Sequence, residues 1–410
     1  MGDEKRNSTL GLILILGSMA AIGPLSIDMY LPAFNDIALG LNTDKTQVGY
    51  TLTSYFIGIG IGQLLFGPLT DRYGRKWPTV IGLGVFLISA FAIYNTPNIE
   101  FFIGIRVLMA LGGCIGMITS KAIVRDLFPP EDTAKVFSFL MLVMGIAPVI
   151  APTIGGFMVA SFGWRSIFLL LTIYSLIIFF SVTFLLKESK GVDPTVSLKP
   201  LAVAKDYRTV FLNSWFLRYS MAGSLAYAGM FAYISGASFI YMDVFGLSQQ
   251  QFGWTFGLNA GGYIGGAQIN RLFLKRWSSS LVCKRTMLLQ SMVAVIMVIS
   301  FFIPVLSKGI TIAGIWIYLF CLGFITPNTT AQALAPFEKL AGTASALIGG
   351  IQMLAGALIT GLVSVLLSVN GTIFPIILVM TICSIIGMIL LNLGMKSIRR
   401  LKKVSTVFHF

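Results

Sequence analysis

Charged residues are scarce in this sequence. They make up 11% of its 410 residues, whereas an average soluble domain carries about 25%. So few charges cannot cover a globular surface in water, which excludes a soluble enzyme, a disordered protein and a fibrous protein. Hydrophobic residues make up 56% of the chain and its mean hydropathy is +0.87, values that indicate a polytopic membrane protein.

Histidine and cysteine are also nearly missing. The single histidine, His409, is next to the last residue, so imidazole chemistry within the membrane is excluded. The four cysteines are far apart and show neither metal-ligand spacing nor a disulfide framework. We expect no metal and no cofactor. An intramembrane enzyme would need clustered His, Asp, Glu or Ser groups, and an ATP-driven pump would need a GxxxxGK[ST] loop; the sequence contains neither.

Long apolar runs fill most of the chain. A bilayer core about 30 Å thick requires about 20 apolar residues per helix. On this basis we expect twelve transmembrane helices, the first of them retained rather than cleaved as a signal peptide. They cover residues 10–34, 47–69, 77–97, 100–123, 133–160, 164–187, 213–240, 249–272, 285–306, 309–333, 342–368 and 372–395.

A single long hydrophilic stretch, Glu188–Arg208, interrupts the apolar pattern. We expect it to divide an all-α integral membrane protein into a six-helix half at 1–187, a cytoplasmic linker at 188–212, and a second six-helix half with a basic tail at 213–410. The net charge is +14, and most of the 29 Lys and Arg residues fall on one side of the predicted helices. Because cytoplasmic segments collect Lys and Arg, both termini are predicted to be cytoplasmic, and nucleic acid is not needed as a partner.

An internal repeat supports two pseudo-symmetric halves. Gly67–Trp77 aligns with Gly266–Arg276, each at the end of the second helix of a half, and Asp71 corresponds to Asn270. Parallel repeats of this kind enclose a binding cavity near the membrane midplane in transporters.

Asp28 is the one acidic residue that we place inside a predicted span, where ionisable groups are costly and usually mark an ion or substrate path. Pro24 and Pro32 flank it. Arg106 is expected at a similar depth in the fourth span, and a membrane guanidinium needs a counter-ion or hydrogen-bond acceptors. We predict that Asp28 and Arg106 form a proton-coupling pair. The alternatives are a hydrated, purely structural Asp28 and a fixed ion pair.

The turn GPLTDRYGRK is a candidate conformational gate. Gly67 and Gly74 allow close approach and a tight turn, while Asp71 can face a neighbouring helix N-terminus or a turn cation such as Arg72 or Arg75. A charge lock of this kind would hold the cytoplasmic face shut. The alternative is a basic loop that only sets topology.

The fifth span contains MGIAPVIAPTIGG, with Pro148 and Pro152 four residues apart and Gly155 and Gly156 after them. Proline removes a helical hydrogen bond, and paired glycines permit close helix contact, so we expect a flexing or sealing helix. Candidate substrate-binding side chains are mostly aromatic or methionine, which suit apolar ligands of variable shape. They are Tyr30, Tyr55, Met109, Met144, Tyr227, Tyr233 and Asn259.

Four stretches resemble the major facilitator superfamily, and in particular its twelve-helix drug:proton antiporters of the Bcr/CflA (bicyclomycin and chloramphenicol resistance) branch. They are SIDMYLPAF, GPLTDRYGRK, APVIAPTIGGF with the following GWRSIF, and PNTTAQALAPFEKLAGTASAL. The second marks the superfamily broadly, whereas the first and last are more specific to the branch.

The resemblance implies a monomeric alternating-access exporter in a bacterial cytoplasmic membrane, driven by the proton gradient. It assigns the helix 4 motif to Arg106, although the usual Arg-x-x-Gln has Met109 here. It assigns the antiporter motif, whose usual Gly-Pro is Ala147-Pro148 here, to five positions. These are Gly145, Pro148, Pro152, Gly155 and Gly156.

The leading hypothesis is therefore proton-coupled efflux of small amphipathic, drug-like compounds, with protons and membrane lipid as the other partners. The alternative is a proton-coupled transporter of a specific metabolite, such as an amino acid or a sugar. A metabolite carrier would favour a polar cavity, whereas the residues within the predicted spans are mainly apolar and aromatic.

Overall fold

The computed structural model describes residues 2–194, 198–337 and 340–407, and the secondary structure of these residues is helical. His409 therefore lies outside the described residues. The helices are α1 (Gly2–Asp28), η1 (Leu31–Ala33), α2 (Phe34–Gly40), α3 (Lys45–Tyr73), α4 (Lys76–Tyr94), α5 (Ile99–Leu127), α6 (Pro130–Phe162), α7 (Arg165–Phe184), α8 (Pro200–Phe211), α9 (Ser214–Ser238), η2 (Phe239–Val244), α10 (Gln249–Leu274), α11 (Ser279–Phe301), α12 (Pro304–Leu334), α13 (Ala341–Asn370) and α14 (Phe374–Val407).

Each of the twelve expected spans overlaps one of these helices. Among the described residues, 11 helical segments are long and apolar enough to cross a membrane. Of the helices that match an expected span, α10 is the one outside this set. It has 26 residues and is therefore long enough to cross a bilayer core, but it is rich in glycine and amide side chains. Because α10 contacts α6 and α12 extensively, it packs against other helices rather than relying on lipid contact alone.

The first span is broken, which differs from the continuous helix expected over 10–34. Helix α1 ends at Asp28, and the chain then forms the short turn η1 and helix α2. Pro32 stands at the start of η1 and has no N–H to continue an α-helical ladder. The break leaves carbonyl groups at the end of α1 that other side chains must satisfy.

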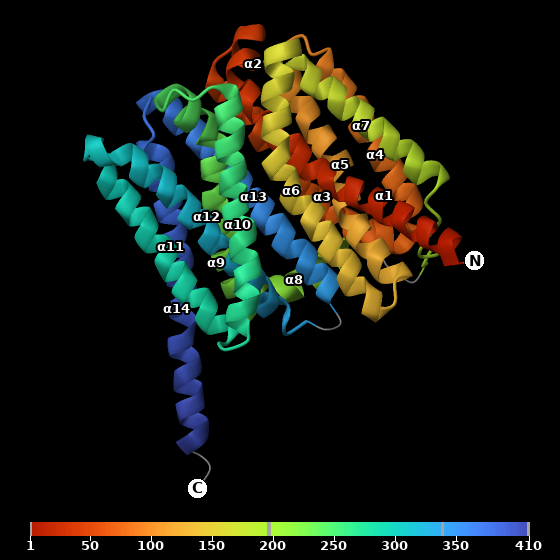
Figure 1. The fold of residues 1–410 in the computed structure, drawn as a ribbon. Helices are drawn as coiled ribbons and strands as arrows, with labels where there is room; N and C mark the ends of the chain where they lie inside the picture. The colour runs from red at the N-terminus through yellow and green to blue at the C-terminus, as the bar shows by residue number, and fades with distance from the viewer. Residues whose placement is uncertain (1, 195–197, 338–339, 408–410) are drawn as a thin grey trace.

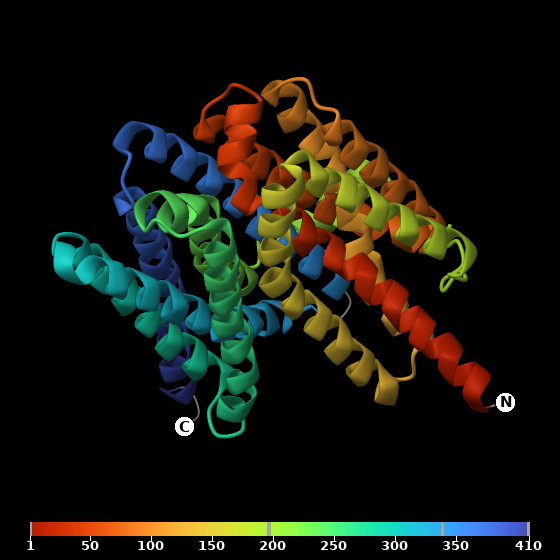
Figure 2. The same ribbon diagram turned by 45° about the horizontal axis from the view of Figure 1, so that its top comes forward.

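The spanning helices run between two ends of the molecule (Figure 1). We call the end that carries the α3–α4 turn, α8 and both termini the termini side, and the end that carries α2 and the α9–α10 connection the far side. Figure 2 shows the same separation of the two ends after rotation. Helices α1–α7 join α9–α14 mainly through two seams, α3 with α13 and α6 with α10.

Candidate functional site

Arg106 lies in the interior of the helices, fully shielded from solvent. Its two terminal nitrogens donate to the carbonyl oxygen of Ser26, at 3.2 and 3.1 Å, and its Nε donates to the carbonyl of Thr51 at 3.4 Å. The Ser26 carbonyl is near the broken end of α1, where the α-helical hydrogen-bond ladder stops. Arg106 of α5 therefore caps α1 and ties it to α3.

Two tyrosine rings contact the Arg106 guanidinium. Its central carbon lies 4.4 Å from the ring centre of Tyr30 and 4.2 Å from that of Tyr55, so both rings make cation–π contacts. The sulfur of Met109 accepts a weak hydrogen bond from Arg106 at 3.8 Å. The sequence-predicted residues Tyr30, Tyr55, Arg106 and Met109 thus form one cluster.

The expected direct pair of Asp28 and Arg106 is not formed. No hydrogen bond or ion pair joins the two side chains within the described ranges, because Arg106 is directed to the Ser26 carbonyl and to the tyrosine rings. Asp28 is 5% exposed and has no polar partner among the described residues. The turn η1, which follows just after Asp28, contacts α9 and α10. The acid therefore lies close to helices of the C-terminal set.

A second cluster lies in α9 and α10. The amide nitrogen of Asn259 donates to the hydroxyls of Tyr233, at 3.0 Å, and of Tyr241, at 2.8 Å. Tyr233 also stacks on Phe256. The sequence analysis identified Asn259 and Tyr233 but missed Tyr241, which lies beyond the expected end of its span in the π-helical turn η2.

Aromatic contacts connect the two sets of helices. The ring of Phe56 in α3 lies 4.1 Å from that of Phe231 in α9, centre to centre, and Phe231 also contacts Tyr227 at 5.0 Å. The remaining candidate, Met144 of α6, is partly buried against the hydrophobic core. The interior is therefore chiefly aromatic and apolar, with Asp28 and Arg106 as its charged groups near the end of α1.

Helix α6 carries the proline and glycine motif between α1 and α10. A side chain at Gly155 would collide with the backbone of Met29, just after the end of α1. Another side of α6 packs against α10. There Gly156 contacts the backbone of Gln249, and Gly145 contacts the side chain of Ile264. Pro148 and Pro152 lie within α6, so the helix lacks two of its regular N–H donors along this seam.

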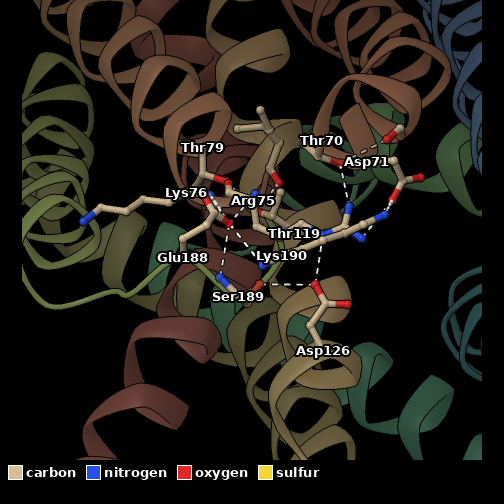
Figure 3. Close-up of polar contacts among 12 residues, drawn as sticks. Thr70, Asp71, Arg75, Lys76, Thr79, Thr119, Asp126, Glu188, Ser189 and Lys190 are labelled. Carbon is tan, nitrogen blue, oxygen red and sulfur yellow. Dashed lines mark hydrogen bonds and ion pairs between the residues drawn. The ribbon is translucent and has the colours of Figure 1, made fainter. Parts of the chain in front are cut away.

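The turn between α3 and α4 forms a charged network on the termini side (Figure 3). The Arg75 guanidinium binds Asp71 at 2.8 Å and Asp126 of α5 at 3.0 Å, and it donates to the Thr70 hydroxyl at 3.1 Å. Lys190 lies 3.5 Å from Asp71. Every one of these residues precedes α8, so Asp71 pairs within the N-terminal part of the chain.

Glu188 completes this network from the linker. Its carboxylate accepts hydrogen bonds from the backbone N–H groups of Arg75 and Lys76, at 2.7 and 3.1 Å, at the N-terminus of α4. A carboxylate is favoured there by the helix dipole. Gly74 has a φ of +85° and leaves no room for a side chain beside Glu188 and Lys190, so the turn requires glycine. Arg72, by contrast, donates to the carbonyl of Pro194, and a side chain at Gly67 would meet open space.

Sequence reasoning missed Asp126, Glu188 and Lys190 as parts of this charged network. The signal was present, because Asp126 and Glu188 are acids in segments where cations prevail, as Asp71 is. Their convergence on Arg75 depends on the packing of α3, α4 and α5, which a linear pattern does not reveal.

A polar clasp that sequence reasoning also missed joins the two sets of helices on the far side. Lys45, at the start of α3, binds Asp243 of η2 at 2.7 Å, and Asn35 of α2 donates to the same carboxylate at 3.2 Å. Gln249 of α10 donates to Asp36 of α2 at 3.0 Å. A pocket of about 220 Å³ lies beside Lys45 and Asp243. Farther along the α3–α13 seam, the Thr53 and Thr360 hydroxyls are 3.0 Å apart.

Comparisons with known proteins identify one family model and several proteins of similar sequence. Residues 16–360 match the family model described as "Major Facilitator Superfamily". An "Uncharacterized MFS-type transporter YdgK" of Bacillus subtilis is 30% identical, covering 92% of this chain and 94% of its own length. A "Bicyclomycin resistance protein homolog" of Haemophilus influenzae is 29% identical, covering 94% and 96%. A "Chloramphenicol resistance protein" of Pseudomonas aeruginosa is 27% identical, covering 97% and 92%.

A solved structure has a similar fold. The crystal structure of a bacterial homolog of the human lysosomal transporter Spinster, in an inward-facing and occupied conformation, matches with a TM-score of 0.70 at 14% identity. The match covers 94% of this chain and 96% of that chain.

Proposed function

Because the chain belongs to the major facilitator superfamily, we propose that it is a proton-coupled multidrug antiporter that exports small amphipathic compounds by alternating access. The expected fold class is confirmed: this is a multi-pass, all-helical membrane protein of the major facilitator type, and its family indicates a transporter rather than an enzyme. The names of the two resistance-protein relatives support drugs as the class of substrate.

We further propose that residues 1–187 and 213–410 form two rocking halves of a monomer in the cell (inner) membrane, with the termini side cytoplasmic. The far-side clasp and the pairing of Asp71 within the first half support an inward-facing conformation, because the clasp joins the halves where the exit would be. In the opposite conformation the clasp would open, and Asp71 would be available to the second half.

The proposed substrate path lies between the cluster around Arg106 and the cluster around Asn259. The tyrosine rings of the two clusters, together with the contacting rings of Phe56 and Phe231, provide apolar surfaces and a few hydroxyl groups. Such a lining suits a flat, amphipathic compound better than a sugar, which requires many hydrogen-bonding partners. This contrast favours drug export over transport of a specific metabolite.

The observation that carries proton coupling is the isolation of Asp28. It is nearly buried, has no hydrogen-bond or ion-pair partner among the residues that the structure describes, and lies just before the turn η1, which contacts α9 and α10. A carboxyl group in this position can hold a proton while the site is dry and release it when water or a substrate arrives. Arg106 serves as a positioning residue that fixes the end of α1, and therefore the place of Asp28.

The test is uphill transport of labelled chloramphenicol in reconstituted vesicles with an imposed pH gradient. We expect wild-type protein to concentrate the drug and Asp28→Asn to lose concentrative transport while still binding it. Asp206→Asn removes an exposed acid of α8 and should transport normally. Accumulation by Asp28→Asn equal to that of wild type would exclude Asp28 as the coupling acid. If wild-type protein moves neither chloramphenicol nor bicyclomycin but concentrates an amino acid or a sugar, the metabolite alternative is correct.

A further inference from the structure

The backbone carbonyl of Leu64 in α3 lacks its usual helical partner. In an α-helix this oxygen accepts a hydrogen bond from the N–H four residues later. That residue is Pro68, which lies inside α3 and has no N–H. In a membrane protein, a carbonyl released in this way needs another donor.

Tyr207 of α8 supplies that donor. Its hydroxyl lies 2.8 Å from the Leu64 carbonyl oxygen. Burial raises the pKa of Tyr207 to about 12, so the phenol keeps its proton at physiological pH and acts as a donor throughout. Helix α8 itself packs against α13 and α9, so this hydrogen bond connects an element attached to the C-terminal helices with a helix of the N-terminal set.

The bond lies next to a close contact of the α3–α13 seam. The Leu64 side chain packs against Gly350 of α13, where an added Cβ would stand 2.8 Å from a Leu64 methyl carbon. Figure 1 shows α8 near the lower ends of α9 and α13, on the termini side. The linker helix therefore contacts α13 directly and α3 through Tyr207.

We propose that Tyr207 is a positioning residue that latches the linker helix α8 onto the carbonyl released by Pro68 and thereby stabilises the conformation with the far side closed. When the two halves rock to close the termini side, the ends of α3 and α13 approach each other. A helix bonded to α3 and packed on α13 must then move, and the Tyr207–Leu64 bond must break. The proposal rests on alternating access in the proposed function but not on the identity of the substrate.

The test is a double-mutant cycle of Tyr207→Phe and Pro68→Ala, measured as distances between spin labels. One label pair spans the termini side (Arg125→Cys with Arg276→Cys), and another spans the far side (Glu100→Cys with Val369→Cys). All four of these positions are exposed, and the four native cysteines are buried, so the introduced thiols are the reactive ones.

We expect Tyr207→Phe to shift the equilibrium about 2- to 12-fold toward shorter termini-side and longer far-side distances, the range that one hydrogen bond supports. Pro68→Ala restores an N–H in α3 that competes for the Leu64 carbonyl, so it should shift the equilibrium in the same direction. The decisive result is non-additivity: Tyr207→Phe should have little further effect once Pro68→Ala is present. Thr209→Val is the control, because this α8 hydroxyl bonds within its own helix.

Unchanged distances in a folded, monodisperse Tyr207→Phe protein would overturn the latch, and so would strictly additive effects of the two substitutions. Failure of alternating access has a different signature. In that case, the wild-type distances would stay in one population at every pH and at every concentration of added chloramphenicol.

Discussion

At the scale of single residues, Arg106 combines three tasks that are specific to a guanidinium. It donates two hydrogen bonds to one carbonyl, a third to another, and makes cation–π contacts with two tyrosine rings. A lysine ammonium keeps the charge but has neither the fork of donors nor the planar surface. Positive charge alone therefore does not account for an arginine at position 106.

We predict that Arg106→Lys destabilises the protein by about 1–3 kcal/mol, because it leaves the Ser26 carbonyl without its donors in a buried place. Concentrative drug transport should fall by about tenfold or more, since the end of α1 and Asp28 lose their anchor. Thermal unfolding in detergent and transport in vesicles measure the two effects. Arg276→Lys, at an exposed position, is the matched control. Equal stability and transport in Arg106→Lys would mean that charge suffices.

At the scale of elements, α6 is held by backbone contacts on two sides. Gly155 meets the backbone beyond the end of α1, and Gly253 of α10 meets the backbone of Thr153. Because backbone atoms cannot rotate away as a side chain can, these glycines set the distance between helices. The prolines of α6 weaken its internal ladder along the same contact.

We predict that Gly155→Ala destabilises the protein by about 1–3 kcal/mol, as overpacking against a rigid neighbour does. Gly104→Ala in α5 is the matched control, because a methyl group there meets open space and alanine favours a helix. A lower midpoint of thermal unfolding for Gly155→Ala, with no decrease for Gly104→Ala, is the expected pair of results. If both variants unfold like wild type, the α1–α6 contact is looser than this packing indicates.

At the scale of the whole molecule, the clasp of Lys45 and Asp243 joins the halves on the far side. The Lys45 side chain is 50% exposed and that of Asp243 is 24% exposed, so the pair contributes only about 0–1 kcal/mol, and added salt screens it. A small energy is suitable for a contact that breaks in every turn of the proposed transport cycle. The amide groups of Asn35 and Gln249 add hydrogen bonds to the carboxylates of Asp243 and Asp36 in the same closure.

We predict that Lys45→Asp shifts the population up to about fivefold toward an open far side, because two carboxylates then face each other. Adding Asp243→Lys should restore the wild-type distribution by exchanging the charges. Spin-label distances across the far side measure this shift, and high salt should reduce it. Lys308→Asp is the control, since Lys308 binds a carbonyl of its own half, that of Phe245. The clasp has no part in closure if Lys45→Asp leaves the distances unchanged.

Much of the molecule follows from local chemistry along the chain. Apolar runs long enough to cross a bilayer dictate helices, because the membrane leaves backbone groups no other partners. The scarcity of charge makes one buried acid and one buried arginine conspicuous, and the Gly74 turn and the Pro148–Pro152 spacing are local backbone effects. For this reason the helices, the fold class and most members of the two clusters were predictable from the amino-acid order.

The partners of these groups were not predictable in the same way. Asp28 and Arg106 were expected to bind each other, yet Arg106 caps the broken end of α1, and Asp28 has no hydrogen-bond or ion-pair partner among the described residues. Two further contacts join residues that are far apart in the chain. They are the ion pair of Lys45 with Asp243 and the hydrogen bond of Tyr207 to the Leu64 carbonyl. Hydropathy and periodicity describe how each helix meets lipid or protein, but the choice of partner depends on where helices break and which backbones approach. Those features arise when all the helices pack together.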